Sequence, residues 1–305
     1  MPKVSVILPN YNHSAYLEER IESIMGQTYQ DFELIMIDDC STDGSREIME
    51  KYRGNPKVGQ IVFNERNSGS AFAQWDKGIS LAKGDLIWIA ESDDNAHPKM
   101  LETLVSEFVQ DSQCVLAFSS AMLTDTDGRQ IGLHPKHAKI GKDLHLGGSK
   151  FIKKWLIKGN FVVNASGALF KKSAFQGLSE PILREYKTLR GCGDWLFWIG
   201  VARQGNVAYI HQPLNLFRQH GTNTTTALRT SGDFLLEQNK FFAALKESGI
   251  RCGLRQFKNN VYQVWYLNYS DGKNLPENKR AEAISELKSY PLLRFLAFFK
   301  NFYTK

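Results

Sequence analysis

The stretch Asp85-Leu86-Ile87-Trp88-Ile89-Ala90-Glu91-Ser92-Asp93-Asp94 leads from an apolar run directly into three clustered carboxylates. The apolar run has the length and composition of a buried β-strand. Carboxylates crowded at a strand end repel one another unless a cation neutralises them, and hard divalent ions take such oxygen ligands. The stretch therefore predicts a metal site, whose obvious companion is a diphosphate. The alternative is structural, because Asp93, Asp94 and Asn95 can also begin a turn and cap a helix near Pro98.

Length and composition indicate one large α/β core with a smaller appendage, because the chain has 305 residues, of which 42% are hydrophobic and 23% charged. The net charge of +6 suits anionic ligands or anionic membrane surfaces. A spread-out excess of this size is also common in proteins that bind neither. We expect no nucleic-acid partner.

The cysteines and the N-terminus favour a reducing, cytoplasmic location. The four cysteines lie far apart without C-x-x-C spacing, which argues against a zinc site and a disulfide framework. The N-terminus runs straight into a strand, and no apolar stretch reaches the roughly eighteen residues of a spanning helix. We expect a protein that is neither exported through a signal peptide nor integral to a membrane. The cysteines are Cys40, Cys114, Cys192 and Cys252.

The first 125 residues alternate between strand-like and helix-like periods. This alternation predicts a mainly parallel sheet wrapped by helices on both faces. Ligands of such sheets bind at the carboxyl ends of the strands, so residues 9–12, Asp38-Asp39 and the acidic tetrad 91–94 are expected to line one cleft. The expected strands are 4–8, 32–37, 61–63, 85–90 and 114–118, and the expected helices begin at Ser14 or cover 44–52, 71–81 and 98–109.

The second half is mixed in character. Residues 134–148 are loop-like and rich in His, Lys and Gly, and residues 232–305 are typical of helices. Between them we expect a hairpin turn at 125–128, helices at 150–157 and 194–203, and strands at 168–171, 207–210 and 214–217.

The chain contains several characteristic motifs, namely Val4-Ser5-Val6-Ile7-Leu8-Pro9-Asn10-Tyr11-Asn12, Ile37-Asp38-Asp39-Cys40-Ser41-Thr42-Asp43-Gly44-Ser45, Asn67-Ser68-Gly69, Glu91-Ser92-Asp93-Asp94, Gly193-Asp194-Trp195-Leu196-Phe197-Trp198 and Pro213-Leu214-Asn215-Leu216-Phe217-Arg218-Gln219-His220. Together these motifs closely resemble the family 2 glycosyltransferases over roughly residues 1–222. The resemblance implies a GT-A-type, Rossmann-like α/β fold with a mainly parallel sheet flanked by helices, a nucleotide-diphosphate sugar donor, Mn²⁺ or Mg²⁺, and inversion at the anomeric carbon.

The same resemblance implies a division of the chain. A glycosyltransferase domain covers 1–225, with a nucleotide-sugar half at 1–125 and an acceptor and catalytic-base half at 126–225. A helical C-terminal extension covers 226–305.

Carried over by position, the resemblance implies the roles of individual residues. Asp194 is the catalytic base that takes the proton of the acceptor hydroxyl. A structural alternative is that Asp194 caps the following helix, and both roles are compatible. The implied metal ligands are Asp93, Asp94 and His220, and Asp93 is the first choice among them. The alternative for His220 is a surface histidine without a role in the site. The implied donor-nucleotide contacts are Pro9, Tyr11, Asn12, Asp39, Asn67, Glu91 and Asp93, although the segment around Asp39 is also turn-forming chemistry.

The chain departs from the family pattern at two places near the donor. Glu91 stands where family members usually have Asp, so its reach to the ribose or to a metal-bound water is open. Gln74-Trp75-Asp76-Lys77-Gly78 stands where an Ala-Arg-Asn-x-Gly pattern is common, so an expected positive contact is absent. Lys77, Arg66 or a residue of the second half are its possible replacements.

The C-terminal stretch 291–305 places apolar residues at helical spacing among basic ones. Such a helix can lie on an anionic leaflet, which would put the enzyme at the inner face of the cytoplasmic membrane, or it can pack on the core or on a second subunit of a homo-oligomer.

The resemblance, together with these motifs, implies an inverting glycosyltransferase of the hexosyl or N-acetylhexosaminyl type. It would move a sugar to a glycan or lipid-linked glycan in cell-surface polysaccharide synthesis. The alternatives are a catalytically silent nucleotide-sugar-binding scaffold and a nucleotidyltransferase. A nucleotidyltransferase would carry a Gly-rich, basic loop after its first strand. This chain has Pro9-Asn10-Tyr11-Asn12-His13-Ser14 at that place, without glycine or lysine.

Overall fold

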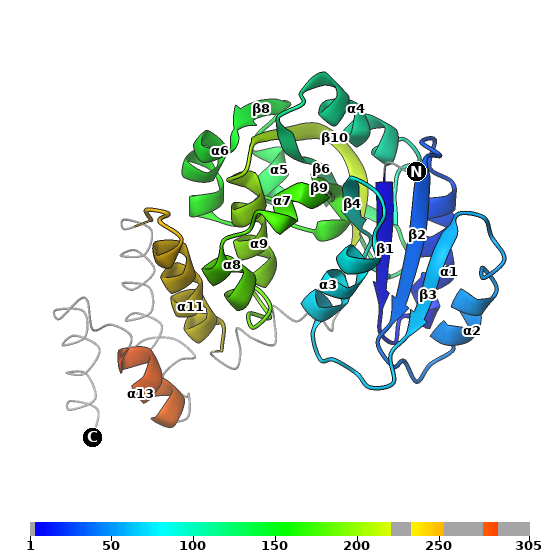
Figure 1. The fold of residues 1–305 in the computed structure, drawn as a ribbon, viewed down its shortest axis with the longest axis horizontal. Helices are drawn as coiled ribbons and strands as arrows, with labels where there is room; N and C mark the ends of the chain where they lie inside the picture. Colours follow the sequence, from blue (N-terminus) through cyan, green and yellow to red (C-terminus); the bar gives the residue numbers. More distant parts are fainter. Residues whose placement is uncertain (1–3, 221–232, 253–276, 286–305) are drawn as a thin grey trace. The chain divides into compact units, whose positions relative to one another are not determined.

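The computed structural model describes residues 4–220, 233–252 and 277–285 (Figure 1). The contacts within the chain divide it into two units. The first comprises residues 1–178 and 198–220, and the second comprises 179–197 and 221–305. This division differs from the predicted boundary at residue 225, because it groups the residues around Asp194 with the C-terminal extension.

The N-terminal half of the first unit is a parallel sheet with strand order β3-β2-β1-β4, as the strand-helix alternation predicted (Figure 1). Its elements in chain order are β1 (Val4–Asn10), α1 (Ser14–Met25), β2 (Phe32–Asp38), α2 (Ser45–Glu50), β3 (Val58–Phe63), α3 (Ala71–Leu81) and β4 (Leu86–Ile89).

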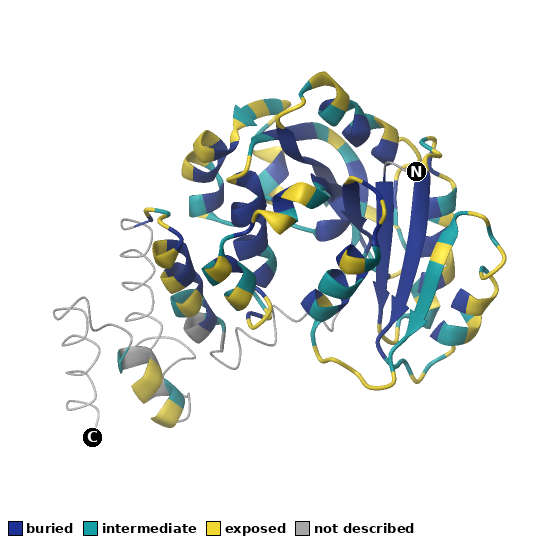
Figure 2. Cartoon of the chain, in the orientation of Figure 1, coloured by how far each residue is buried: buried dark blue, intermediate teal, exposed yellow. Residues whose placement is uncertain are grey.

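The two faces of this sheet bury alternate residues, because successive side chains of a strand point to opposite sides. Val6 and Leu8 of β1 join a core cluster with the apolar residues of α1, such as Leu17 and Ile21. Ile7 instead meets α3, where a Cβ added at Gly78 would lie only 2.2 Å from Cγ2 of Ile7. Buried residues accordingly run along β1 and β2 without a break (Figure 2).

The other half of the sheet mixes parallel and antiparallel pairs. β9 lies antiparallel between β4 and β6, and β6 pairs with β10 in parallel. The elements are β5 (Asn95–Ala96), α4 (Met100–Gln110), β6 (Cys114–Thr124), β7 (Gln130–Leu133), α5 (Pro135–Ala138), β8 (Leu144–Gly147), α6 (Gly148–Lys154), η1 (Leu156–Lys158), η2 (Ala165–Gly167), β9 (Ala168–Lys171), α7 (Lys172–Gln176) and β10 (Asn206–Arg218).

Two expectations for this half were wrong. Residues 134–148 form a short helix, α5, and a strand, β8, that pairs with β10, so the segment is not simply a loop. The strands expected at 207–210 and 214–217 are one continuous strand, β10. Its register against β6 shifts around Pro213, because proline has no N–H to donate to the ladder.

The elements described in the second unit are helices. These are α8 (Glu180–Glu185), the start of α9 (Gly193–Ala202), α11 (Asp233–Glu247) and α13 (Glu277–Ser285). The last two confirm the predicted helical character of the C-terminal extension where it is described. The stretch 291–305 lies outside the described residues. Within the described part of the chain, every helix is too short or too polar to cross a membrane.

Candidate active site

The loops that follow β1 and β2 are joined to each other at the carboxyl edge of the sheet. Asn12 and Cys40 have φ values of 55° and 65°, a left-handed conformation that is uncommon outside glycine. Two hydrogen bonds to the neighbouring loop stabilise this conformation of Asn12. Its N–H donates to Oγ of Ser41 at 2.9 Å, and its Oδ1 accepts from the N–H of Thr42 at 2.8 Å. Asn12, a predicted nucleotide contact, therefore shapes this edge.

The paired carboxylates Asp38 and Asp39 at the end of β2 have separate partners. Asp38 is fully buried and accepts hydrogen bonds from Nδ2 of Asn10, the N–H of Ser41 and Nε of Arg46. The carboxylate of Asp39 accepts from the side chain and N–H of Ser68, and Oδ1 also accepts from Nδ2 of Asn64. Asp38 thus holds its own loop, and Asp39 holds the loop before α3.

The other predicted nucleotide contacts lie around the same edge. Asn67 donates from Nδ2 to the carbonyl of Asp39, at 3.0 Å. Tyr11 is one of the most exposed large apolar side chains among the described residues, at 47% exposure, whereas Pro9 is buried within β1. The tyrosine ring is therefore available to a planar ligand, and Pro9 offers mainly backbone.

The acidic tetrad directly follows β4, and its two aspartates point to different surroundings. Asp94 is 1% exposed, and its carboxylate accepts from Oγ of Ser166, Nδ2 of Asn164 and the N–H of Arg218. The guanidinium of Arg218 in turn donates from Nε to the carbonyl of Asp93, at 2.8 Å. Asp94 therefore ties the tetrad to β10.

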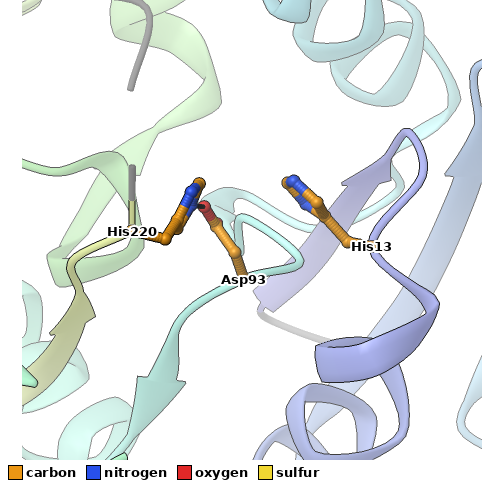
Figure 3. A group of neighbouring side chains, drawn as sticks. All are labelled: His13, Asp93 and His220. Carbon is orange, nitrogen blue, oxygen red and sulfur yellow. Dashed lines mark hydrogen bonds and ion pairs between the residues drawn. The ribbon is translucent and has the colours of Figure 1, made fainter. Parts of the chain in front are cut away.

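Asp93 joins two histidines from distant parts of the chain (Figure 3). One potential ligand atom from each of His13, Asp93 and His220 lies within 4.8 Å of the other two, and all three side chains are partly buried. His13 comes from the loop after β1, and His220 follows β10. The structure thus brings together Asp93 and His220, as predicted, and adds His13, which the sequence reasoning missed. Among described residues, Asp94 is not part of this group.

The charges of this cluster stabilise one another. Nε2 of His220 lies 2.8 Å from Oδ2 of Asp93, and this hydrogen bond raises the pKa of His220 above its usual value. Burial alone would raise the pKa of Asp93, but the hydrogen bond from His220 and the charge of His13 lower it. Nδ1 of His13 lies 2.8 Å from Oγ of Ser92, which orients the ring. Asp93 is therefore held ionised, as a metal ligand must be.

Glu91 is held by the tryptophan that stands in the altered segment 74–78. Nε1 of Trp75 donates to Oε1 of Glu91, at 2.9 Å. Burial and the charge of Asp93 raise the pKa of Glu91 to about 8. A neutral indole thus restrains Glu91 where a cation was expected.

A buried cation lies on the helix side of the tetrad. Arg20 of α1 is fully buried, and its Cζ lies 5.0 Å from the ring centre of Trp88. Burial lowers the pKa of Arg20 to about 10, while the charges of Asp94, Asp93 and Glu91 oppose this change. Arg20 therefore balances part of the negative charge of the tetrad from inside the core.

Asp194 belongs to the second unit, in the first turn of α9. Its Oδ1 accepts from the N–H of Trp195 at 2.6 Å, and the ring of Trp195 packs on Phe241, with centres 4.3 Å apart. The preceding loop is fixed by Glu237 of α11, whose carboxylate accepts from the N–H groups of residues 190 and 191. Asp194 is the second residue of α9 and not its N-cap, although its carboxylate still accepts from one N–H of the first turn. The catalytic role stays a prediction.

Comparison with known proteins identifies a family. The model of the family described as glycosyl transferase family 2 matches residues 5–178, which is more than half of the chain. TuaG of Bacillus subtilis, a glycosyltransferase whose name refers to teichuronic acid biosynthesis, is 36% identical over 130 residues, covering 43% of this chain and 51% of TuaG. The poly(ribitol-phosphate) β-N-acetylglucosaminyltransferase TarP of Staphylococcus aureus is 36% identical over 108 residues, covering 34% and 32%. The chain thus spans about half or less of these relatives.

Solved structures share the fold. TarS of Staphylococcus aureus in complex with UDP-GlcNAc superimposes with a TM-score of 0.68 at 18% identity, over 98% of this chain and 88% of that one. The mannosyltransferase PcManGT of Pyrobaculum calidifontis, in complex with GDP-Man and Mn²⁺, gives a TM-score of 0.57 at 18% identity, over 95% and 76%. These likenesses confirm the predicted GT-A-type α/β fold.

Proposed function

The chain belongs to glycosyl transferase family 2, and we propose that it transfers a sugar, with inversion, from a nucleotide-diphosphate sugar to a hydroxyl group of a cell-surface glycan or its lipid-linked precursor. The observation that carries this proposal is the group of His13, Asp93 and His220 at the carboxyl edge of the sheet. A cation held there would face the loops predicted to bind the donor.

The donor set of this group fits a divalent transition metal. Two imidazoles and one carboxylate suit Mn²⁺ better than Mg²⁺, which prefers all-oxygen shells. The structural neighbour PcManGT contains Mn²⁺ with its donor, which supports the same choice here. When bound, the ion would supply positive charge for the departing diphosphate. His13, Asp93 and His220 would hold it, and Ser92 would orient His13.

The predicted nucleotide contacts lie at the same edge of the sheet, at or after the carboxyl ends of β1, β2, β3 and β4. Tyr11 is exposed and can stack on a base, while Asn12 and Asn67 order the loops on either side of Asp39. In this proposal Asp39 accepts from the base, and Glu91, restrained by Trp75, faces the ribose.

Asp194 is proposed as the base of a one-step displacement. The acceptor oxygen forms a bond to the anomeric carbon while the bond from that carbon to the diphosphate breaks. The hydroxyl proton passes to the carboxylate of Asp194, and the electron pair of the broken bond leaves with the nucleoside diphosphate. Attack opposite to the leaving group inverts the anomeric centre.

A panel of nucleotide sugars, screened for thermal stabilisation with Mn²⁺, Mg²⁺ or chelator, tests donor binding. The donors that stabilise are then offered with glycan acceptors, and the anomeric configuration of the product is read by NMR. Stabilisation without any transfer or donor hydrolysis would favour the silent scaffold. Full transfer activity in a folded Asp194→Ala protein would refute the role of Asp194.

A further inference from the structure

The whole positive excess of the chain lies in one short stretch, the lysine-rich segment of residues 134–158. Seven lysines against one acidic residue, Asp143, give this segment a charge of +6, which equals the net charge of the entire chain. The other 280 residues are therefore balanced. The lysines are Lys136, Lys139, Lys142, Lys150, Lys153, Lys154 and Lys158.

These charges face solvent. All of the seven lysines except Lys136 are exposed. Lys136 donates instead to the carbonyl of Asn160, at 2.7 Å. The salt bridges of the described residues use other cations, so the six exposed lysines are not neutralised by acids. A set of unpaired like charges weakens folding by repulsion and attracts anionic ligands.

Helix α6 arranges three of the lysines on one side. Lys150, Lys153 and Lys154 have the spacing that places side chains next to each other on a helix, and Phe151 and Ile152 are buried on the other side. The first residue of α6 packs tightly against the backbone at the end of α9. A Cβ added at Gly148 would lie only 1.6 Å from the carbonyl oxygen of Ala202. Exposed positions are visible along α6 (Figure 2). These charges therefore stand on a fixed platform, which we name the lysine face.

The lysine face is connected to the candidate active site by a short stretch of chain. After Lys158 at the end of η1, Asn164 and Ser166 donate to the carboxylate of Asp94 in the tetrad. Lys136 fastens α5 to the same stretch through the carbonyl of Asn160. Lys158, at the end of the segment, is therefore only six positions from Asn164, which contacts the tetrad within the first unit.

The side chains of the segment favour a polymer in water over a lipid surface. The exposed large apolar side chains among the described residues are Tyr11, Val109 and Ile131, all outside the segment. Membrane-surface helices need such groups to insert. Phe151 of the segment is buried, whereas Trp155 is partly exposed and lies beneath Nζ of Lys154, which is 5.4 Å from its ring centre. A cation beside an indole suits a sugar ring that carries a negative charge.

We infer that the lysine face, extended by Lys158 and Trp155, is the docking surface of the acceptor, and that this acceptor is an anionic glycan with negative charges along its chain. The inference rests on the proposed glycosyltransferase function and gives the chemical class of the acceptor.

The test compares oligogalacturonate with its methyl-esterified form, which has the same sugars without the charges. Binding to the full chain is measured by calorimetry at low and high salt. We expect the charged oligomer to bind more tightly, to weaken as salt rises, and to lose about tenfold in affinity when Lys150, Lys153 and Lys154 are all replaced by Gln. The control protein replaces Lys83, Lys99 and Lys246 by Gln, which changes the net charge equally.

Equal weakening in the two triple variants would overturn the inference, as would equal affinity for the esterified oligomer. Vesicles of phosphatidylcholine with phosphatidylglycerol are the rival probe, and tighter binding to them than to oligogalacturonate, lost in the lysine-face variant, would also overturn it. Donor-induced thermal stabilisation with Mn²⁺ is measured on the same proteins. If the donor stabilises every protein while the oligomer does not bind, the acceptor inference fails and the proposed function stands.

Discussion

Nε2 of His220 lies 2.8 Å from Oδ2 of Asp93, although 127 positions separate the two residues in the chain. The contact joins the end of β10 to the residues after β4, and His13 completes the group from the loop after β1. This relationship leads to predictions about metal binding that do not depend on knowing the acceptor.

Replacement of His13 should weaken Mn²⁺ binding because the ion loses one of its protein ligands. We expect His13→Gln to raise the dissociation constant for Mn²⁺ by at least about tenfold, and Ser92→Ala to raise it by about tenfold through loss of the bond that orients His13. Titration followed by electron paramagnetic resonance of free Mn²⁺ measures both. His145→Gln, a change of an exposed histidine outside the group, is the control. Unchanged Mn²⁺ affinity in His13→Gln would remove His13 from the site.

Replacement of Arg20 should destabilise the metal-free protein and strengthen metal binding. Arg20→Met leaves the buried carboxylate of Asp94 without its nearby cation, which we expect to lower the free energy of unfolding by on the order of 3 kcal/mol. The more negative tetrad should then bind Mn²⁺ several-fold more tightly, so added Mn²⁺ should reduce the deficit. Chemical denaturation with and without Mn²⁺ measures this. Arg53→Met, at an exposed arginine, is the control, and weaker Mn²⁺ binding in Arg20→Met would contradict the proposed charge balance.

Replacement of Glu237 should impair catalysis from within the C-terminal extension. Its carboxylate accepts from the N–H groups of Arg190 and Gly191, at 2.8 and 2.7 Å, just before Asp194. We expect Glu237→Ala to lower kcat roughly tenfold, because a displaced base loses its alignment, with little change in donor-induced stabilisation. Glu247→Ala, an exposed position in the same helix, is the matched control. An unaltered kcat would show that this loop does not position the base.

The contribution of His137 to stability should fall in mild acid. This residue is 1% exposed, its Nδ1 accepts from the N–H of Ala121, and its Nε2 lies 2.9 Å from the carbonyl of Phe161. Burial, with smaller contributions from the charges of Lys136 and His211, lowers the pKa of His137 from 6.5 to about 4. Between these values the unfolded chain binds a proton at His137 that the folded protein does not, so the contribution of His137 to stability decreases as pH falls through this window. The raised pKa of Glu91 has the opposite effect.

The loss from His137 should reach about 3 kcal/mol near pH 4. Neighbouring His134, whose pKa burial also lowers to about 4, adds to it. Denaturation of the parent protein and of His137→Gln is compared between pH 7 and pH 4, and the parent should lose more stability, or gain less, over this window. An equal change in the two proteins would exclude His137 as the cause.

Much of the fold was readable from local patterns. The alternation of apolar periods placed α3 at Ala71–Leu81 without error, and the apolar run before Glu91 became β4. Carboxyl ends of parallel strands share one edge of a sheet, so the residues after β1, β2 and β4 were expected together, and these strands are indeed neighbours. Local patterns failed where strand pairing decides the secondary structure. β8 is a strand because it pairs with β10, and the residues of β8 alone do not indicate this pairing.

The sequence by itself determined the parallel half of the sheet, the family and the presence of acids and histidines near strand ends, because periodicity and strand-end position are local properties. Only the tertiary structure decided which of these groups meet. In the folded chain Asp94 is buried and accepts a hydrogen bond from Ser166, and His13 lies beside Asp93 and His220. Arg20 is buried near the tetrad. The physical reason is that a ligand group is a set of distances between side chains far apart in the chain, and those distances exist only once the sheet has assembled.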